Sequence, residues 1–206
     1  MSQFFQIHPE NPQQRLIRQA VDIIKSGGVI AYPTDSAYAL ACDIGNKNGA
    51  DRIRTIRRLT EKHNFTLVCR DLSDIAVYAK VNNGQYRQIK AHTPGPYTFI
   101  LKATSEVPRR LMNPKRRQIG IRIPDNKITL ALVEELGHPL MSTTLSLPNE
   151  ELPMTDPYDI RASLEHSLDL VIDGGFCGFE ASSVIDLSDE EPVVLRRGCG
   201  DVTAFE

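Results

Sequence analysis

An apolar strand runs directly into a polar turn at Val29-Ile30-Ala31-Tyr32-Pro33-Thr34-Asp35-Ser36. The four apolar residues 29–32 lie between glycines and a proline, which predicts a short buried strand. Pro33 has no N–H to donate to a sheet ladder, so the strand must end there. Ligands of α/β folds bind beyond the carboxyl ends of strands. The segment therefore predicts a ligand site, although an ordinary Asx or Ser/Thr turn contains the same residue types.

Helix and strand patterns alternate on both sides of this segment. A helix is expected to start at Asn11-Pro12, as N-cap and first helical residue, and to end at Gly27-Gly28. The periodicity predicts further helices at 48–59, 72–79, 83–91, 127–136 and 157–166, and strands at 65–69, 97–103, 118–123, 140–144, 168–172, 183–187 and 193–196. This order predicts a mixed α/β sheet covered by helices, in a single domain spanning residues 1–206.

The composition is typical of a soluble globular protein, with 41% hydrophobic and 24% charged residues. No apolar run approaches the length of a membrane span, and the first nine residues do not resemble a secretory signal. The four cysteines are scattered and contain no Cys-x-x-Cys pair, which is expected of thiols in a reducing cytosol. The histidines show no metal-ligand spacing, so we expect a cytoplasmic protein without a protein-held metal or a membrane partner.

Positive charge is concentrated in two segments, although the formal net charge is −2. One basic segment spans 52–62, and the other, 109–117, contains no acidic residue. Such segments predict an anionic partner such as a nucleotide or an RNA backbone, although a solvated helix face or loop has the same pattern. The residues expected to contact RNA are Arg52, Arg58, Lys62, Arg110, Lys115, Arg116 and Arg117.

Hydroxyl and basic side chains stand at the ends of several expected strands. Thr34 follows the first strand, a hydroxyl-rich run at 142–146 ends another, and Ser182 precedes a third. Arg122 lies inside an apolar strand, where its burial requires either a bound anion or an internal carboxylate. Because several such places coincide, the sequence predicts a preorganised pocket for an anionic small molecule. It contains neither a P-loop nor a Rossmann glycine motif.

Six segments in the same order resemble the YrdC/Sua5/YciO family, and in particular its YciO branch. They are residues 33–40, 94–101, 120–124, 138–140, 182–186 and 195–198. Characterised members of this family are threonylcarbamoyl-adenylate synthases. The resemblance implies a twisted, open, mostly parallel α/β sheet with a concave, positively charged face.

The resemblance also implies a reaction. L-Threonine and bicarbonate would form an N-carboxylate that attacks the α-phosphorus of ATP, giving pyrophosphate and threonylcarbamoyl-AMP for tRNA modification. The motifs that match imply threonine binding by Thr34, His63, Arg122, Ser142 and Ser182, ATP binding by Arg57, Gln118, Thr144 and Arg196, and catalysis by Arg57, Thr144 and Ser146. Mg²⁺ would enter with ATP and be held mainly by its phosphates.

The sequence departs from the family motifs in three places. The K-x-R motif is Arg57-Arg58-Leu59, the S-x-N motif is Thr144-Leu145-Ser146, and Gln118 replaces a usual hydroxyl residue. Arginine presents a planar fork where lysine presents a point charge, and leucine presents no charge. Each lost charge-stabilising contact costs roughly 10²–10³ in rate. We therefore expect a weak synthase, with a double-stranded RNA- or tRNA-binding protein that lacks synthase activity as the alternative.

Overall fold

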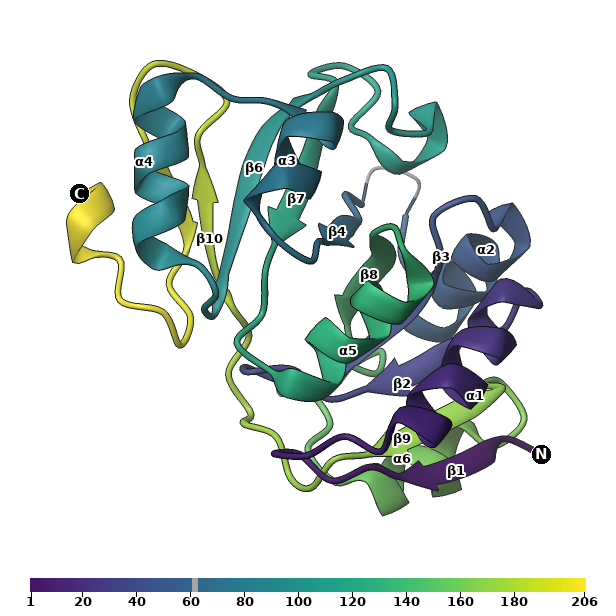
Figure 1. Cartoon of the computed structure of the whole chain (residues 1–206). Coiled ribbons are helices and arrows are strands. Elements are labelled where there is room, and N and C mark those ends of the chain that lie inside the picture. The colour runs from purple at the N-terminus through teal and green to yellow at the C-terminus, as the bar shows by residue number, and fades with distance from the viewer. Residues whose placement is uncertain (61–62) are drawn as a thin grey trace.

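The computed structural model describes residues 1–60 and 63–206 (Figure 1). Lys62, one of the expected RNA contacts, lies outside the described residues. The helices are α1 (Gln14–Lys25), α2 (Lys47–Arg57), α3 (Leu72–Tyr78), α4 (Asn83–His92), α5 (Lys127–Leu136) and α6 (Pro157–Leu164). The strands are β1 (Gln3–Gln6), β2 (Ile30–Tyr32), β3 (Ala39–Asp43), β4 (Thr66–Val68), β5 (Ala79–Lys80), β6 (Tyr97–Ala103), β7 (Gln118–Arg122), β8 (Leu140–Thr144), β9 (Leu170–Asp173), β10 (Ser183–Asp186) and β11 (Val193–Arg196).

These strands form one mixed sheet in the order β1-β9-β2-β3-β8-β4-β7-β6-β10-β11, with β5 beside β6. The expected mixed α/β sheet is confirmed. The resemblance implied a mostly parallel sheet, and this detail is wrong, because antiparallel pairings outnumber parallel ones within the described residues. Parallel pairs join β9 to β1 and β2, β4 to β7, and β6 to β10. The turn 33–38 between β2 and β3 illustrates why. It is too short for the crossover helix that parallel neighbours need, so the two strands pair antiparallel.

The ends of the first and fifth helices show how local side chains set helix boundaries. Helix α1 begins at Gln14, two residues later than Asn11-Pro12 predicts, because a local turn precedes it. In that turn the His8 Nδ1 atom accepts from the N–H groups of residues 10 and 11. Helix α5 has the predicted bounds, with the Asn126 side chain capping its start and Gly137, at φ +83°, ending it.

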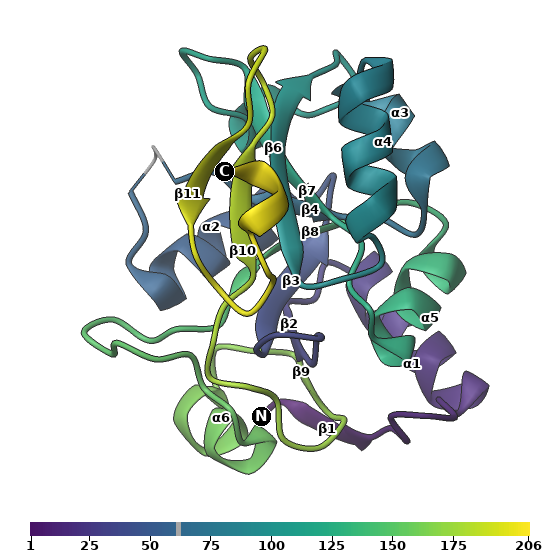
Figure 2. The same cartoon turned by 90° about the vertical axis from the view of Figure 1, so that its left-hand side faces the viewer.

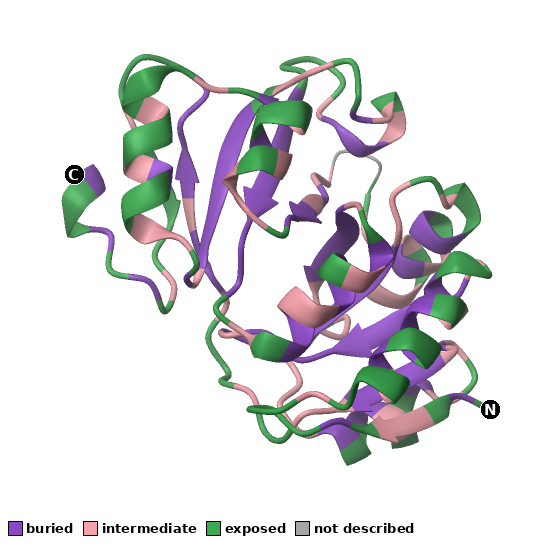
Figure 3. Cartoon of the chain, in the orientation of Figure 1, coloured by how far each residue is buried: buried purple, intermediate pink, exposed green. Residues whose placement is uncertain are grey.

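Two layers of helices cover the sheet unequally. On one face, α1 and α5 lie side by side over β2, β3, β8 and β9 (Figure 1). On the other face, apolar residues of α2, α3, α4 and α6 pack with the alternate side chains of the strands. Buried residues accordingly line the strands, and exposed residues lie on the outer sides of the helices (Figure 3).

The first face loses its helical cover beyond α5. Side chains alternate between the two faces of a strand. On β7, Ile119 and Ile121 face the apolar layer of α3 and α4, so Gln118 and Arg122 face the other way. Beyond β7 the sheet continues through β6 and then β10, and β11 completes this end of the sheet (Figure 2). The strands thus present a polar face that is available for a ligand.

None of the helices in residues 1–60 and 63–206 has the combination of length and apolarity needed to cross a bilayer.

We expect the central strand β4 to be a sensitive point for stability. Leu67 is fully buried in the apolar layer, so Leu67→Ala should lower the free energy of unfolding by about 2–5 kcal/mol. Val77, which is 48% exposed on α3, offers a control, since Val77→Ala should change it by less than about 0.5 kcal/mol. Urea unfolding followed by circular dichroism measures both values, and equal effects would contradict the assignment of Leu67 to the core.

Candidate functional site

A cavity of about 810 Å³ lies over the uncovered part of the first face. Its lining includes side chains from β4, β6, β7, β8, β10 and β11, together with the end of α2. Nine residues that the sequence assigned to threonine, ATP or catalysis line this cavity: Arg57, His63, Gln118, Arg122, Ser142, Thr144, Ser146, Ser182 and Arg196. Segments far apart in the sequence therefore meet at one place.

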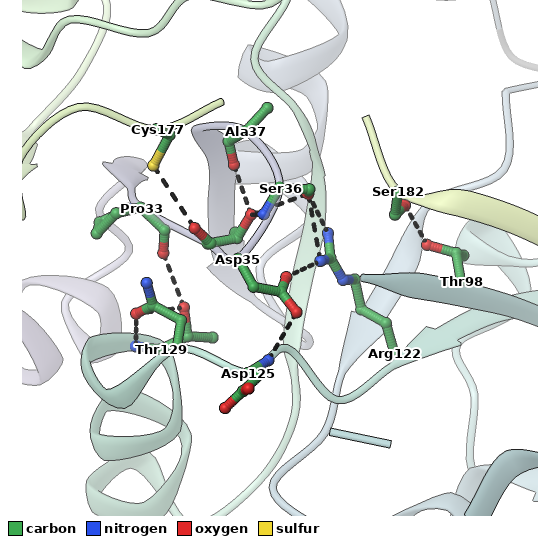
Figure 4. A network of polar contacts seen from close by, with 12 residues as sticks. Pro33, Asp35, Ser36, Ala37, Thr98, Arg122, Asp125, Thr129, Cys177 and Ser182 are labelled. Atoms are coloured by element: carbon green, nitrogen blue, oxygen red, sulfur yellow. Dashed lines mark hydrogen bonds and ion pairs between the residues drawn. The ribbon is translucent and has the colours of Figure 1, made fainter. Parts of the chain in front are cut away.

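Arg122 is held by the turn that follows β2 (Figure 4). Its Nη2 atom donates to Asp35 Oδ1 at 2.5 Å, and both Nη atoms reach Ser36 Oγ at 3.3–3.4 Å. The other carboxylate oxygen of Asp35 accepts from the N–H of Asp125 at 2.8 Å. The internal carboxylate that the sequence left open is thus present. Nevertheless, Arg122 Nε is buried with no hydrogen-bond acceptor among the described residues.

Thr34 stabilises this turn and does not line the cavity. Its hydroxyl donates to the carbonyl of Ala37 at 2.6 Å and accepts from the N–H of Ser36 at 3.1 Å. The hydroxyl of Thr129, on α5, donates to the carbonyl of Pro33 at 2.8 Å. The structure therefore places Thr34 behind Asp35 and Ser36, where it orients the residues that contact Arg122.

Arg57 and His63 share one hydroxyl group, that of Thr143. Arg57 Nη1 donates to Thr143 Oγ1 at 2.7 Å, and His63 Nε2 lies 3.2 Å from the same oxygen. Arg57 Nε also donates to the carbonyl of Ser146 at 3.2 Å. Because a guanidinium can only donate, Thr143 accepts from Arg57 and keeps its own hydrogen for His63. Thr143 was not predicted as a site residue from the sequence, because the motif compared with S-x-N starts at the next residue, Thr144.

Arg196 is fixed by the residues that precede β10. Its Nε atom donates to the carbonyl of Ser182 at 3.0 Å, and Nη2 lies 3.3 Å from Ser182 Oγ. Ser182 Oγ is in turn 2.8 Å from Thr98 Oγ1. The N–H of Gly198 donates to Ser183 Oγ at 3.0 Å, and a Cβ at position 198 would overlap the carbonyl oxygen of Ala181. The chain after β11 therefore lies directly against the segment that holds Arg196.

Arg57 and Arg196 bring positive charge to the cavity, and neutral oxygen atoms hold both side chains in place. The hydrogen bonds of Arg57 and Arg196 go to hydroxyl and carbonyl oxygens, and neither forms an ion pair within the described residues. Desolvation and then the charge of Arg196 lower the pKa of Arg57. Desolvation and then the charge of Arg122 lower the pKa of Arg196. These guanidinium groups lie close enough to repel each other, which favours the binding of an anion between them.

His63 is neutral in this environment. Desolvation, followed by the charges of Arg57, Arg54 and Arg196, lowers the pKa of His63 from 6.5 to about 4. At neutral pH its ring nitrogens therefore act as one hydrogen-bond donor and one acceptor. His63 adds polarity to the cavity without adding charge.

The remaining predicted residues differ in how far their side chains are already occupied. Gln118 Nε2 donates to Ser188 Oγ at 2.5 Å and lies 3.4 Å from the buried carboxylate of Asp186. Ser142 Oγ lies 2.7 Å from Tyr32 Oη and donates to the carbonyl of Leu40 at 3.0 Å. Burial raises the pKa of Tyr32 to about 12, so its phenol stays neutral.

The residues expected to contact RNA fall into three groups. Arg52 pairs with Asp169 at 2.8 Å, and Arg110 donates to the carbonyl of Ile44 at 2.7 Å, so both have partners within the chain. Arg116 lines the cavity. The remaining described candidates, Arg58, Lys115 and Arg117, are exposed. Elsewhere in the described part of the chain, no cluster of three or more His, Cys, Asp or Glu side chains could hold a metal ion.

Comparisons with known proteins agree with this architecture. A Sua5/YciO/YrdC family model, described as "Telomere recombination", matches residues 22–198. The chain is 60% identical over 206 residues to an uncharacterized protein of Haemophilus influenzae, covering 100% of both. It is 57% identical over 205 residues to YciO of Escherichia coli K12, also covering 100% of both. It is 30% identical to a threonylcarbamoyl-AMP synthase of Nitrosococcus oceani, over 77% of this chain and 85% of that protein.

Solved structures place the chain in the same group. The crystal structure of E. coli YciO matches with a TM-score of 0.97 at 56% identity, covering 100% of both chains. P. abyssi Sua5 complexed with L-threonine matches with a TM-score of 0.87 at 25% identity, covering 95% of this chain and 57% of that one. The fold defines a YrdC-like α/β protein. The chain belongs to the Sua5/YciO/YrdC family, and its close relatives are YciO proteins.

The Asp35–Arg122 pair should be essential for stability. Asp35→Ala leaves a buried guanidinium without its counter-charge, so the free energy of unfolding should fall by about 3–5 kcal/mol. Asp125→Ala is the matched control, because Asp125 is exposed and contributes only its backbone N–H. Chemical denaturation measures both variants, and an Asp35→Ala variant as stable as the control would refute this role.

His63 should remain neutral down to about pH 4. The unfolded chain, with a histidine pKa near 6.5, binds more protons than the folded chain between these values, so the free energy of unfolding should fall as pH decreases from about 6.5 to 4. NMR titration of the His63 ring measures the midpoint directly. In Arg57→Ala the midpoint should move upward, since one repelling charge is removed, and a wild-type midpoint near 6.5 would contradict this environment.

Proposed function

We propose that the chain is an ATP-dependent threonylcarbamoyl-AMP synthase of low activity. It would combine L-threonine, bicarbonate and ATP, release pyrophosphate, and supply threonylcarbamoyl-AMP for tRNA modification. Support comes from family membership, from the 30% identity to a threonylcarbamoyl-AMP synthase, and from the shape and charge of the cavity.

The observation that carries this proposal is a pair of arginines, Arg57 and Arg196, that have no carboxylate partner among the residues the structure describes. Arg57 and Arg196 are bound to neutral oxygens, and the charge of Arg196 lowers the pKa of Arg57. Such a pair is suited to a polyphosphate, because phosphate oxygens satisfy the remaining guanidinium donors and relieve the repulsion. Fixed positive charge at this place also stabilises the charge that develops when a carboxylate attacks the α-phosphorus.

The amino acid would lie deeper in the cavity, near Arg122. The Nε–H of this residue, which has no acceptor within residues 1–60 and 63–206, offers a donor to a carboxylate oxygen, although Asp35 already neutralises much of the charge. Ser182 and His63 add polar atoms for the hydroxyl and the amine of threonine. The L-threonine complex of P. abyssi Sua5, whose fold matches over 95% of this chain, supports a threonine subsite within this fold.

Two replaced motif residues support the proposal of low activity. Leu59, at the second basic position of the K-x-R motif, packs against the apolar core and offers no charge to a ligand. At the asparagine position of S-x-N, Ser146 binds Arg57 through its backbone carbonyl oxygen, and its side chain lacks the amide group that asparagine would offer to a ligand. Mg²⁺ would arrive with ATP and be coordinated mainly by phosphate oxygens.

Arg57 should therefore be required for turnover. The assay is pyrophosphate release that depends on both threonine and bicarbonate, with mass-spectrometric detection of threonylcarbamoyl-AMP. Arg57→Ala should lower kcat/KM by roughly 10²–10³, the usual cost of one charge-stabilising contact. The matched control is Arg87→Ala, because Arg87 is exposed on α4 and lies outside the cavity.

Two outcomes would reject the synthase proposal. One is the absence of product at protein concentrations that would reveal a thousandfold-impaired enzyme. The other is product formation that Arg57→Ala leaves unchanged. The alternative, binding of double-stranded RNA or tRNA, is favoured by the exposed Arg58, Lys115 and Arg117. Its sign would be RNA affinity that falls steeply with salt and does not depend on ATP.

A further inference from the structure

Three large apolar side chains line the same cavity and are exposed to solvent. Leu152, Phe179 and Leu195 are 59%, 63% and 58% exposed, respectively. They come from three separate segments: the chain after β8, the chain before β10, and β11 itself. Single exposed apolar residues are common, but three that line one cavity offer it apolar surface that a ligand can cover.

The opening differs from the interior of the cavity in its chemistry. Ligand pockets usually have an apolar interior with a few polar groups. Here the buried lining is largely polar, with Gln118, Arg122, Ser142 and Ser182, and the exposed lining carries the large apolar side chains. A ligand that matches both parts has a charged, hydrogen-bonding end and an apolar end, and the aromatic ring of Phe179 favours a flat one.

Charge sets the direction in which such a ligand enters. Glu151 and Glu180 are exposed and line the cavity near Leu152 and Phe179 in the sequence. These carboxylates disfavour a phosphate beside them, and the cationic Arg57 and Arg196 favour a phosphate in their own part of the cavity. The exposed Arg116, which also lines the cavity, lies 4.0 Å from the carboxylate of Asp186. The apolar end of the ligand is therefore left beside the three exposed side chains.

We propose that Phe179, flanked by Leu152 and Leu195, stacks against the base of a bound nucleotide. This inference rests on the proposed function for the presence of a nucleotide and adds the surface that holds its base. Stacking on an aromatic ring provides affinity for any base with a flat π-face, so the contact recognises a nucleotide against an inorganic polyphosphate.

The neighbouring Phe176 provides a matched control. It is in the same segment before β10 and is 78% exposed, but it does not line the cavity. Phe176→Ala and Phe179→Ala thus remove the same side chain from nearby positions of similar exposure. Isothermal titration calorimetry with ATP and with inorganic triphosphate then separates base binding from phosphate binding.

Phe179→Ala should weaken ATP binding about 10-fold and leave the affinity for triphosphate unchanged. Phe176→Ala should change neither affinity. A loss of the same size for both ligands in Phe179→Ala, or no loss for ATP, would overturn the inference. Thermal melting of each variant checks that the fold is retained.

A second variant tests the stacking contact directly. The chain contains no tryptophan, so Phe179→Trp introduces a single tryptophan at the opening, whose emission can be excited apart from that of the tyrosines. ATP should quench or shift its emission, and triphosphate at saturating concentration should not. An identical response to both ligands would also overturn the inference, because phosphate binding alone would then explain it.

These results remain separable from the test of the synthase proposal. Base-dependent binding in a protein that forms no threonylcarbamoyl-AMP would support the stacking role and reject the synthase. Product formation with unchanged ATP affinity in Phe179→Ala would do the reverse.

Discussion

The ion pair between Arg122 and Asp35 is the contact on which the arrangement of the cavity depends. It joins the middle of the sheet, at β7, to the turn after β2, which lies four strands away in the sheet order. Both side chains are nearly inaccessible to solvent, with 8% and 9% of their surface exposed. A charge at this depth is tolerable because it is paired and because Ser36 and the Asp125 N–H complete the hydrogen bonds. The turn that begins at Pro33 thus acquires its fixed shape from a residue 87 positions later in the chain.

Regular patterns in the sequence were enough to predict most of this framework. The strands 97–103, 140–144 and 193–196 and the helix 127–136 have the bounds that periodicity and capping residues indicate. Strands β1, β3 and β5 were not predicted. Strand β5 has two residues, and β1 is a four-residue edge strand without an alternating pattern, so their pairing partners define them more than their own sequences. The polar residues at strand ends identified the cavity because a sheet brings those ends together.

The finer structure of the site depends on contacts that no local pattern encodes. Arg122 could have been matched to a ligand or to an internal acid, and the partner is set by the path of the turn that carries Asp35. The role of Thr143 is revealed only by the structure, which places Arg57, at the end of α2, within hydrogen-bond distance of the Thr143 hydroxyl near the end of β8. Phe179 and Leu195 are ordinary apolar residues in the sequence, and their exposure at one opening follows from how two loops and an edge strand converge.

The close approach at Gly198 has a consequence for how this site can change over evolutionary time. Any side chain at this position would push the segment after β11 away from Ala181 and Ser182, and Arg196 would move with it. The position of Arg196 therefore depends on a close backbone contact that leaves little room for substitution at position 198. The side chains at the opening belong to exposed loops and an edge strand, which accept substitution easily. New ligand preferences in such a protein would arise first at the opening, while Arg196 stays where the backbone holds it.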